Sequence, residues 1–477
     1  MKLFNKSLIV LMMVGLFGLT ACDEFLDVNT DPNNPTEVPV SLLMTSSQTY
    51  LAYTMGGDVN RYAGTFVQHF AGVQGQAQEE YDLYNFGDDE TNNFWRFGMY
   101  AGALGDLDLI MKDASANGSP HYEGVAKIMM AYGIGAMTDL FGRVPFSEAF
   151  QFTDNTTPAY DNQEDIYNTI INDLTEQGIA LCQESESVFS PGSDDLIYGG
   201  DLNKWIKFAR FLQLRYHNHK SVQDAEGSAN AILALLDDND DEFTATGDAA
   251  NFFFFLSPNS GHPLFQFEQQ RGQIAVSDEV LDRMNALNDP RIPLYADSIP
   301  GGTYVGAPNG TTIQDQVHET FSGVGPFYES SNSPVPLGTY YEQKFIEAEA
   351  AMRLNQTGRA HQAYLAAIRA NFDALGLDQA AYDAYVGQAT VDPGEANLTM
   401  ELLMTQKFLA MFTQGAESWT DWRRTGIPAI TPSIGNILND QIPVRFPYPE
   451  SEFSFNAGNV PSTTLLDPVW FQDGTED

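Results

Sequence analysis

Apolar residues recur at helical spacing in pairs of segments along most of this chain. In the segment 125–140 they fall on one helix face, and the same spacing returns around Trp205, Tyr341 and Met404. Helical pairs with small residues on one helix and large ones on the next resemble tetratricopeptide-type hairpins, which bury their apolar faces by stacking. We therefore expect a mainly α fold with few short strands and four tetratricopeptide-like helical pairs, at about 92–140, 163–221, 339–375 and 399–425.

The segment between the second and third helical pairs has a different composition. The segment of about 240–338 is rich in Gly, Pro, Asn, Ser and aromatic residues, and binding residues concentrate in loops held by a rigid scaffold. We predict one α-helical domain over residues 40–477, with this segment as a loop-rich, ligand-binding insertion.

The first 22 residues have the pattern of a bacterial lipoprotein signal. Lys2 and Lys6 precede a short apolar run, and Leu19-Thr20-Ala21-Cys22 forms a lipobox. The apolar run is too short to cross a hydrocarbon core of about 30 Å. We predict a signal peptide over 1–21, lipidation of Cys22 and an acylated tether over 22–39. The alternative is a plain secretory signal that happens to end in cysteine.

Charge and cysteine content exclude some classes of function. The formal net charge of −41 repels phosphate backbones and anionic headgroups, so we expect no nucleic acid partner. Beyond Cys22 no apolar run approaches the length of a membrane span, so a lipid anchor is the predicted membrane attachment. With Cys22 lipidated, Cys182 has no partner for a disulfide.

Catalytic and metal-binding motifs give no positive signal. The chain has no GxSxG elbow, Walker A loop or SxxK motif. The acidic run Asp237–Glu242 lacks the Gly and Glu that an EF-hand loop requires. We therefore predict no catalytic residue, no metal and no cofactor. A pair of carboxylates at glycosidase separation stays open, because a sequence does not give distances.

Two regions combine aromatic and hydrogen-bonding side chains, as a sugar site requires. A sugar presents an apolar face to an aromatic ring and a rim of hydroxyls to amides and charged groups. For each residue, a solvated or packed role is the alternative, and Trp95, Trp205 and Trp419 are expected to have structural roles. The candidate ligand contacts are Tyr81, Asp82, Tyr84, Asn92 and Asn93 in the first region, and Arg271, Gln273, Tyr304 and Tyr328 in the second.

Several ordered motifs resemble the SusD/RagB family of outer-membrane nutrient-binding lipoproteins. They are Leu140-Phe141-Gly142-Arg143-Val144-Pro145, Asn203-Lys204-Trp205-Ile206-Lys207-Phe208, Glu347-Ala348-Glu349-Ala350 and Asp421-Trp422-Arg423-Arg424. The resemblance implies a lipoprotein anchored to the outer membrane and facing the cell exterior. It further implies capture of a nutrient, most often an oligosaccharide, and delivery to a partner TonB-dependent transporter of the SusC-like type, without bond cleavage.

Three alternatives remain beside this interpretation. A surface glycoside hydrolase would place two carboxylates about 5–10 Å apart in a ligand cleft and would release products. A lipoprotein of the same uptake type could bind peptides in place of glycans. An ABC-type solute-binding lipoprotein is disfavoured, because its two lobes alternate strands and helices.

Overall fold

The computed structural model describes residues 38–238, 241–257, 260–312 and 317–476. The predicted signal peptide, Cys22 and nearly all of the predicted tether lie outside the described residues. Most of the described chain is helical, which confirms the predicted fold class. The strands are short: β1 (Phe70–Gly72) pairs antiparallel with β3 (Ile274–Val276), and β2 (Ala250–Phe253) pairs antiparallel with β4 (Pro334–Gly338).

The chain enters the fold through a long, nearly continuous helical segment. Helix α2 begins at Val40, where the sequence predicts the first helical residues. Two glycines, Gly56 and Gly57, lie in the π-helical turn η1 and interrupt its regular α geometry. The first helical elements are α2 (Val40–Thr54), η1 (Met55–Val59), α3 (Asn60–Phe66), η2 (Ala77–Asp82), α4 (Asp88–Asn93) and η3 (Phe94–Leu104).

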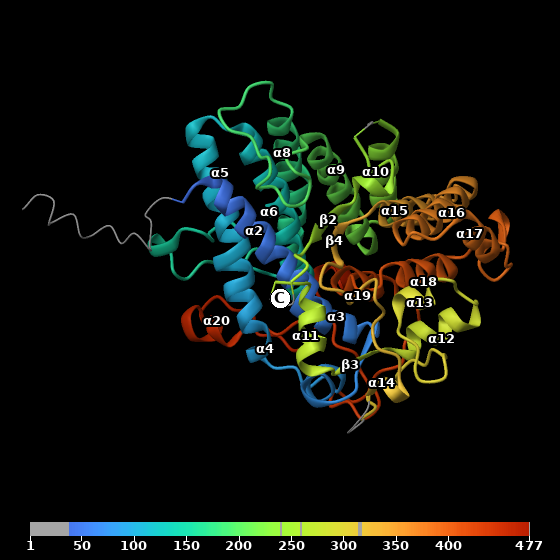
Figure 1. The fold of residues 1–477 in the computed structure, drawn as a ribbon. Helices are drawn as coiled ribbons and strands as arrows, with labels where there is room; N and C mark the ends of the chain where they lie inside the picture. Colours follow the sequence, from blue (N-terminus) through green and yellow to red (C-terminus); the bar gives the residue numbers. More distant parts are fainter. Residues whose placement is uncertain (1–37, 239–240, 258–259, 313–316, 477) are drawn as a thin grey trace, which may run out of the picture.

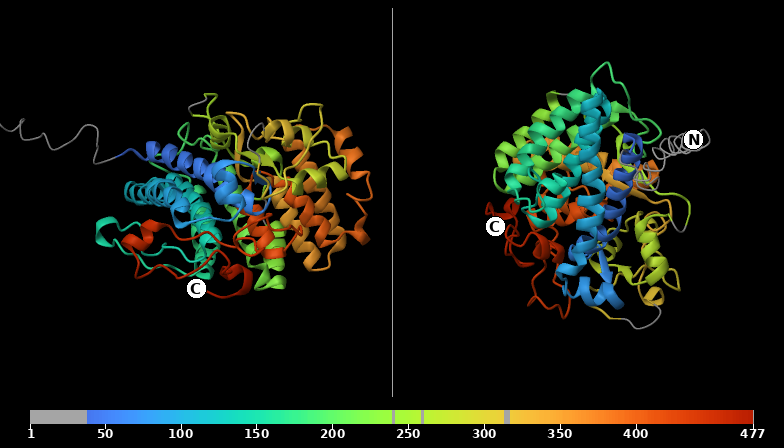
Figure 2. Two further views of the ribbon diagram at one scale, coloured as in Figure 1. Left: turned by 90° about the horizontal axis from the view of Figure 1, so that it is seen from below. Right: turned by 90° about the vertical axis from the view of Figure 1, so that its left-hand side faces the viewer.

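The four predicted helical pairs are present at the expected positions. Their elements are α5 (Gly105–Asn117) with α6 (Pro120–Phe141); α7 (Gln163–Thr169), η5 (Ile170–Leu174) and α8 (Thr175–Cys182) with α9 (Leu202–His219); α15 (Tyr340–Arg353) with α16 (Thr357–Ala374); and α18 (Met400–Ala410) with α19 (Gly415–Thr425). Helix α6 is followed by Gly142, which adopts a φ of 81°. Glycine takes up this positive φ at little energetic cost, because it has no Cβ. Figures 1 and 2 show the first pair toward one end of the molecule and the third toward the other.

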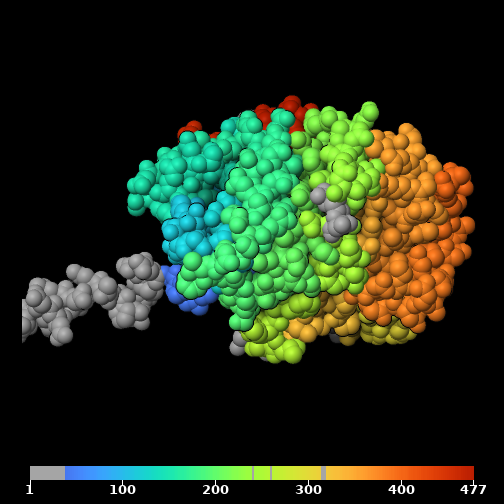
Figure 3. Space-filling model, turned by 90° about the horizontal axis from the view of Figure 1, so that it is seen from above, coloured from blue at the N-terminus to red at the C-terminus, as the bar shows by residue number. Residues whose placement is uncertain are grey.

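Shorter elements connect the pairs and form the insertion and the tail. They are η4 (Phe152–Asp154), η6 (Lys220–Val222), α10 (Ala225–Asp238), η7 (Thr246–Asp248), α11 (Pro263–Arg271), α12 (Asp278–Ala286), α13 (Ile292–Tyr295), α14 (Val317–Thr320), α17 (Gln379–Val386), η8 (Glu395–Asn397), α20 (Glu450–Phe455) and α21 (Trp470–Asp473). In the space-filling view, green residues of the first half of the chain lie directly against orange residues of the third pair (Figure 3).

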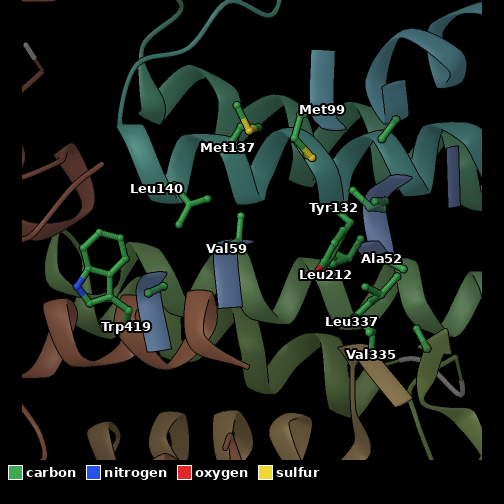
Figure 4. Packing of buried hydrophobic residues seen from close by; sticks show 14 of the residues in the cluster. Ala52, Val59, Met99, Tyr132, Met137, Leu140, Leu212, Val335, Leu337 and Trp419 are labelled. Carbon is green, nitrogen blue, oxygen red and sulfur yellow. The ribbon is translucent and has the colours of Figure 1, made fainter. Parts of the chain in front are cut away.

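The main core forms where the first helices meet α6, α9 and α19. Figure 4 shows Val59, Met99, Leu140 and Trp419 converging there from four different elements. Burying a large apolar side chain contributes about 1.5–3 kcal/mol, so this cluster is a major source of stability. The structural roles predicted for three tryptophans are confirmed, because Trp95, Trp205 and Trp419 are 2%, 0% and 0% exposed.

Charged side chains are buried where the helical pairs meet. Arg215 of α9 donates from Nε and Nη2 to the two carboxylate oxygens of Glu342, both at 2.7 Å. His219, also on α9, lies 3.1 Å from Glu417 and 3.3 Å from Asp139. A buried charge is costly unless it is paired, so these contacts fix how the helices stack.

Among the described residues, no helix combines the length and apolar character that crossing a bilayer requires. Cys182 is buried and carries a free thiol, whose pKa burial raises to about 12. A buried thiol with a raised pKa is chemically inert at neutral pH.

Candidate functional site

A polar hollow of about 410 Å³ lies between the first helical segment and α11. We call it the α3–α11 hollow. Both segments contribute to its lining. The lining residues are Tyr53, Asp58, Arg61, Tyr62, Gln76, Tyr81, Asp89, Glu90 and Asn93 from the N-terminal segment, and Pro263, Gln266, Phe267, Gln270 and Arg271 from α11. Its size lies within the range of sites that bind small molecules.

Local sequence signals and one strand pairing place α11 against the N-terminal segment. Pro263 opens the helix, where its missing N–H costs nothing, and Nδ1 of His262 accepts a hydrogen bond from the Leu264 backbone at 3.2 Å. Gly272 ends the helix with a φ of 58°. The next strand, β3, pairs with β1 in the register Phe70 to Val276, which holds α11 beside α3 (Figure 1).

A buried arginine forms one wall of the α3–α11 hollow. Arg61 is 7% exposed, forms an ion pair with Asp58, and places its guanidinium 4.1 Å from the centre of the Phe267 ring. Burial acts to lower the pKa of Arg61, but Asp58 and two neighbouring tyrosines raise it further, so the net shift is upward. The side chain is therefore a permanent cation fixed against an aromatic face.

Aromatic rings line the hollow at two depths. Tyr81 is 1% exposed and contacts Tyr62 edge to face, with ring centres 4.7 Å apart. Burial raises the pKa of Tyr81 to about 12, which keeps its hydroxyl protonated. Tyr53 is 47% exposed and Phe267 is half-buried, so part of each ring is accessible to a ligand in the hollow.

Carboxyl groups from α4 also line the hollow. Burial, and then the neighbouring Glu80 and Asp89, raise the pKa of Glu90 to about 8. Glu90 is therefore mostly protonated at neutral pH, and Gln76 donates to its oxygens at 3.3 and 3.4 Å. The α3–α11 hollow thus contains donors, acceptors, both signs of charge and aromatic faces, a mixture suited to a polyhydroxylated ligand.

Three of the predicted ligand contacts meet in this hollow. Tyr81 and Asn93 come from the first predicted region and Arg271 from the second, and the structure joins the two regions into one site. Asn93 and Arg271 are exposed at its edge. Their participation in binding stays a prediction.

The structure places three other candidates in supporting positions. Asp82 is fully buried and accepts a hydrogen bond from Asn309 at 2.5 Å, and burial raises the pKa of Asp82 to about 7. The hydroxyl oxygen of Tyr84 accepts a hydrogen bond from the Ser433 backbone at 3.1 Å. Oε1 of Gln273 accepts one from the Ala77 backbone at 3.3 Å, so its contact steadies the turn before η2.

The remaining candidates are spread over other parts of the fold. Asn92 is half-buried, and its Oδ1 has no hydrogen-bond partner among the described residues. Tyr304 packs against the edge of the main core. Tyr328 is 7% exposed and lines a separate cavity of about 250 Å³ beside Tyr340 and Tyr341.

Sequence reasoning missed Asp58, Arg61 and Phe267, which form one wall of the hollow. Asp58 and Arg61 lie within a helical stretch of otherwise apolar pattern, three positions apart, which is the spacing of a helical ion pair. That spacing could have identified the pair. Phe267 gave no comparable signal, because its partner is distant in the sequence.

Comparison with known proteins identifies relatives of this chain. The family model of SusD-like proteins, described as starch-binding associating with outer membrane, matches residues 32–449. None of the curated proteins matches the chain in sequence.

Solved structures share the whole fold. A chitin-binding protein superposes with a TM-score of 0.77 at 25% identity, over 91% of this chain and 99% of its own. A SusD/RagB family protein from Bacteroides thetaiotaomicron gives a TM-score of 0.77 at 25% identity, over 92% and 100%. A chitin-binding SusD homolog from Flavobacterium johnsoniae gives 0.76 at 22% identity, over 91% and 97%.

Proposed function

This chain belongs to the SusD-like family, as its sequence motifs predict, and from that premise we propose a nutrient-capture function. The protein binds an oligosaccharide in the α3–α11 hollow and delivers it to a partner TonB-dependent transporter of the SusC-like type. The family is described as starch-binding and associated with the outer membrane, and two structural relatives are chitin-binding proteins. These names support a glycan as the ligand.

The single observation that carries this proposal is the composition of the α3–α11 hollow. Tyr53 and Phe267 offer ring faces, Arg61 and Arg271 offer donors, and Glu90 offers a carboxyl that is protonated at neutral pH. Stacking on an aromatic ring contributes about 0.5–1.5 kcal/mol beyond area burial, so a few such contacts give moderate affinity. Moderate affinity suits a protein that must release its ligand.

The proposed mechanism is capture and handover without bond cleavage. Proteins of this family are binding proteins, and the catalytic motifs considered above are absent from the sequence. The protonated Glu90 is tied to Gln76 and to the Glu80 carboxyl, and both contacts hold it within the wall. The surface hydrolase of the alternative interpretation would need a free acid and a second carboxylate across the ligand.

We propose the same attachment and orientation that the sequence predicts. Lipidation of Cys22 anchors the protein to the outer membrane, and the tether over 22–39 lets the domain face the cell exterior. Acyl chains contribute about 0.8 kcal/mol per buried CH₂, so several chains anchor a protein stably.

Calorimetric titration of the purified protein tests the proposed function. The ligands are maltoheptaose, chitohexaose and a mixture of short peptides, and each bound mixture is checked for new products by mass spectrometry. Binding of one oligosaccharide with no product supports the proposal. Cleavage supports the hydrolase instead, and binding of peptides alone supports the peptide-binding alternative.

A further inference from the structure

A second hollow lies on the far side of α4 from α11, and its volume is about 580 Å³. It forms between η3, the chain that follows α6, and α20. Its lining includes Trp95, Tyr100, Phe150, Phe152 and Phe455. We call it the η3–α20 hollow.

The floor of the η3–α20 hollow is rigid and aromatic. Trp95 is 2% exposed and donates from Nε1 to Glu452 at 3.3 Å, and Tyr100 donates from its hydroxyl to the Pro145 carbonyl at 2.7 Å. The Phe150 ring is stacked on Tyr100, with ring centres 6.0 Å apart. A ring held by such contacts loses little entropy when a ligand stacks on it.

The rim exposes large aromatic rings to water. Phe152 is 58% exposed and Phe455 is 72% exposed, and both line the hollow. Phe150 and Phe152 have φ angles of 59° and 50°, in the left-handed region that bulky residues rarely adopt. Lys112 donates to the Phe150 carbonyl at 3.2 Å, which helps to hold this strained segment in place. Strain of this kind accumulates at ligand-binding segments.

Polar groups complete the rim. Arg96 is exposed, with its guanidinium 4.9 Å from the Phe97 ring, and Asn155 and Thr156 face the same hollow. Ring faces surrounded by a guanidinium, an amide and a hydroxyl match the apolar face and hydroxyl rim of a sugar.

The two hollows meet along one helix. Asn93 at the end of α4 lines the α3–α11 hollow, and Arg96 in η3 lines the η3–α20 hollow. Asn93 and Arg96 are three residues apart in one continuous helical segment, so the linings of the two hollows are neighbours along the chain. In Figure 1, α4 lies between α11 and α20, the helices that bound the two hollows.

We propose that the η3–α20 hollow is a second glycan-binding site, which holds another stretch of the polysaccharide bound in the α3–α11 hollow. The inference rests on the proposed function and adds that the ligand is a chain longer than one hollow. Once one site is occupied, the second faces an effective ligand concentration in the millimolar range. Two modest sites then hold a polymer tightly, while each releases a short oligosaccharide readily.

The test compares a polymer with a short oligosaccharide of the same sugar. The protein produced from the whole chain and purified in detergent is titrated with soluble starch and maltoheptaose, and with glycol chitin and chitohexaose. The variant Phe152→Ala/Phe455→Ala removes both exposed rings. Its matched control, Val188→Ala/Phe189→Ala, removes two side chains that are 62% and 58% exposed and line neither hollow.

We expect the double variant to bind the polymer at least tenfold more weakly than the control, with oligosaccharide affinity within twofold. Phe455→Ala alone should give a smaller loss in the same direction. An unchanged polymer affinity overturns the second site and leaves this hollow as a surface for a protein partner. Equal losses for polymer and oligosaccharide overturn it as well. If the unaltered protein binds neither form, the proposed function itself fails.

Discussion

The guanidinium of Arg61 lies 4.1 Å from the centre of the Phe267 ring, although Arg61 belongs to the N-terminal helical segment and Phe267 to the insertion. This contact joins α3 to α11 and forms one wall of the proposed glycan site. A cation over a ring contributes about 0.5–2 kcal/mol, depending on how far it is desolvated. Arg61 keeps its ion pair with Asp58 without the ring, so Phe267 can be altered on its own.

Phe267→Ala should weaken oligosaccharide binding about tenfold, because a stacked ring and its apolar area contribute about 1.4 kcal/mol. The protein should stay folded, since Phe267 is only half-buried. Titration calorimetry and thermal unfolding measure the two effects. The matched control is Phe189→Ala, which removes a ring that is 58% exposed on another surface. Equal affinity in both variants would remove Phe267 from the site.

His219 should make stability depend on pH. Burial acts to lower its pKa, but Glu417 and Asp139 outweigh burial and raise it to about 9. The protonated ring therefore stabilises the fold fully below its unfolded pKa of about 6.5, and this contribution is lost as pH rises through about 9.

His219→Gln should accordingly lower the free energy of unfolding by about 3 kcal/mol at pH 6 and by much less at pH 10. Urea unfolding of both proteins at the two pH values measures the difference. Only the difference between the proteins counts, because groups far from His219 titrate equally in both. A gap of the same size at both pH values would show that His219 carries no charge in the folded protein.

Glu90 should also make stability fall as pH rises, but here it is the charged form of the side chain that destabilises the fold. Its pKa is raised to about 8 by burial and by Glu80, so the unfolded chain releases this proton at lower pH than the folded protein. The fold therefore loses stability between about pH 4.5 and 8. Glu90→Gln should raise the Tm above that of the unaltered protein at pH 8.5 and leave it unchanged at pH 4.5. A raised Tm at both values would indicate a packing effect.

Cys22→Ala should move the protein from the membrane fraction to the soluble fraction, because the predicted anchor is lost. Cell fractionation followed by blotting measures this, and protease treatment of intact cells tests exposure at the surface. Retention of the variant in the membrane would contradict the predicted lipid anchor.

Much of the scaffold could be predicted from local patterns. The spacing around Trp205 and Met404 predicts helices that the structure contains, because an amphipathic helix marks its buried face in the sequence. Gly142 follows the last residue of α6, as is typical of a glycine that ends a helix, because it adopts a positive φ at little cost.

The candidate site could be predicted only in part, because contacts between distant segments create it. Tyr81 and Arg271 were candidates from two separate regions, and a pairing of strands only three residues long brings them together. Asp82 is a polar residue of the kind that binds ligands, but the loop that contains Asn309 packs over it and buries it. A polar residue in a loop has the same local pattern whether it faces a ligand or a neighbouring loop.

The most direct test of the account is a crystal structure of the protein with the oligosaccharide that binds most tightly. We expect an intact sugar chain in the α3–α11 hollow, with one sugar ring against Phe267 and hydroxyls near Arg61 and Glu90. A sugar bound elsewhere with this hollow empty, or a cleaved chain within it, would contradict the account.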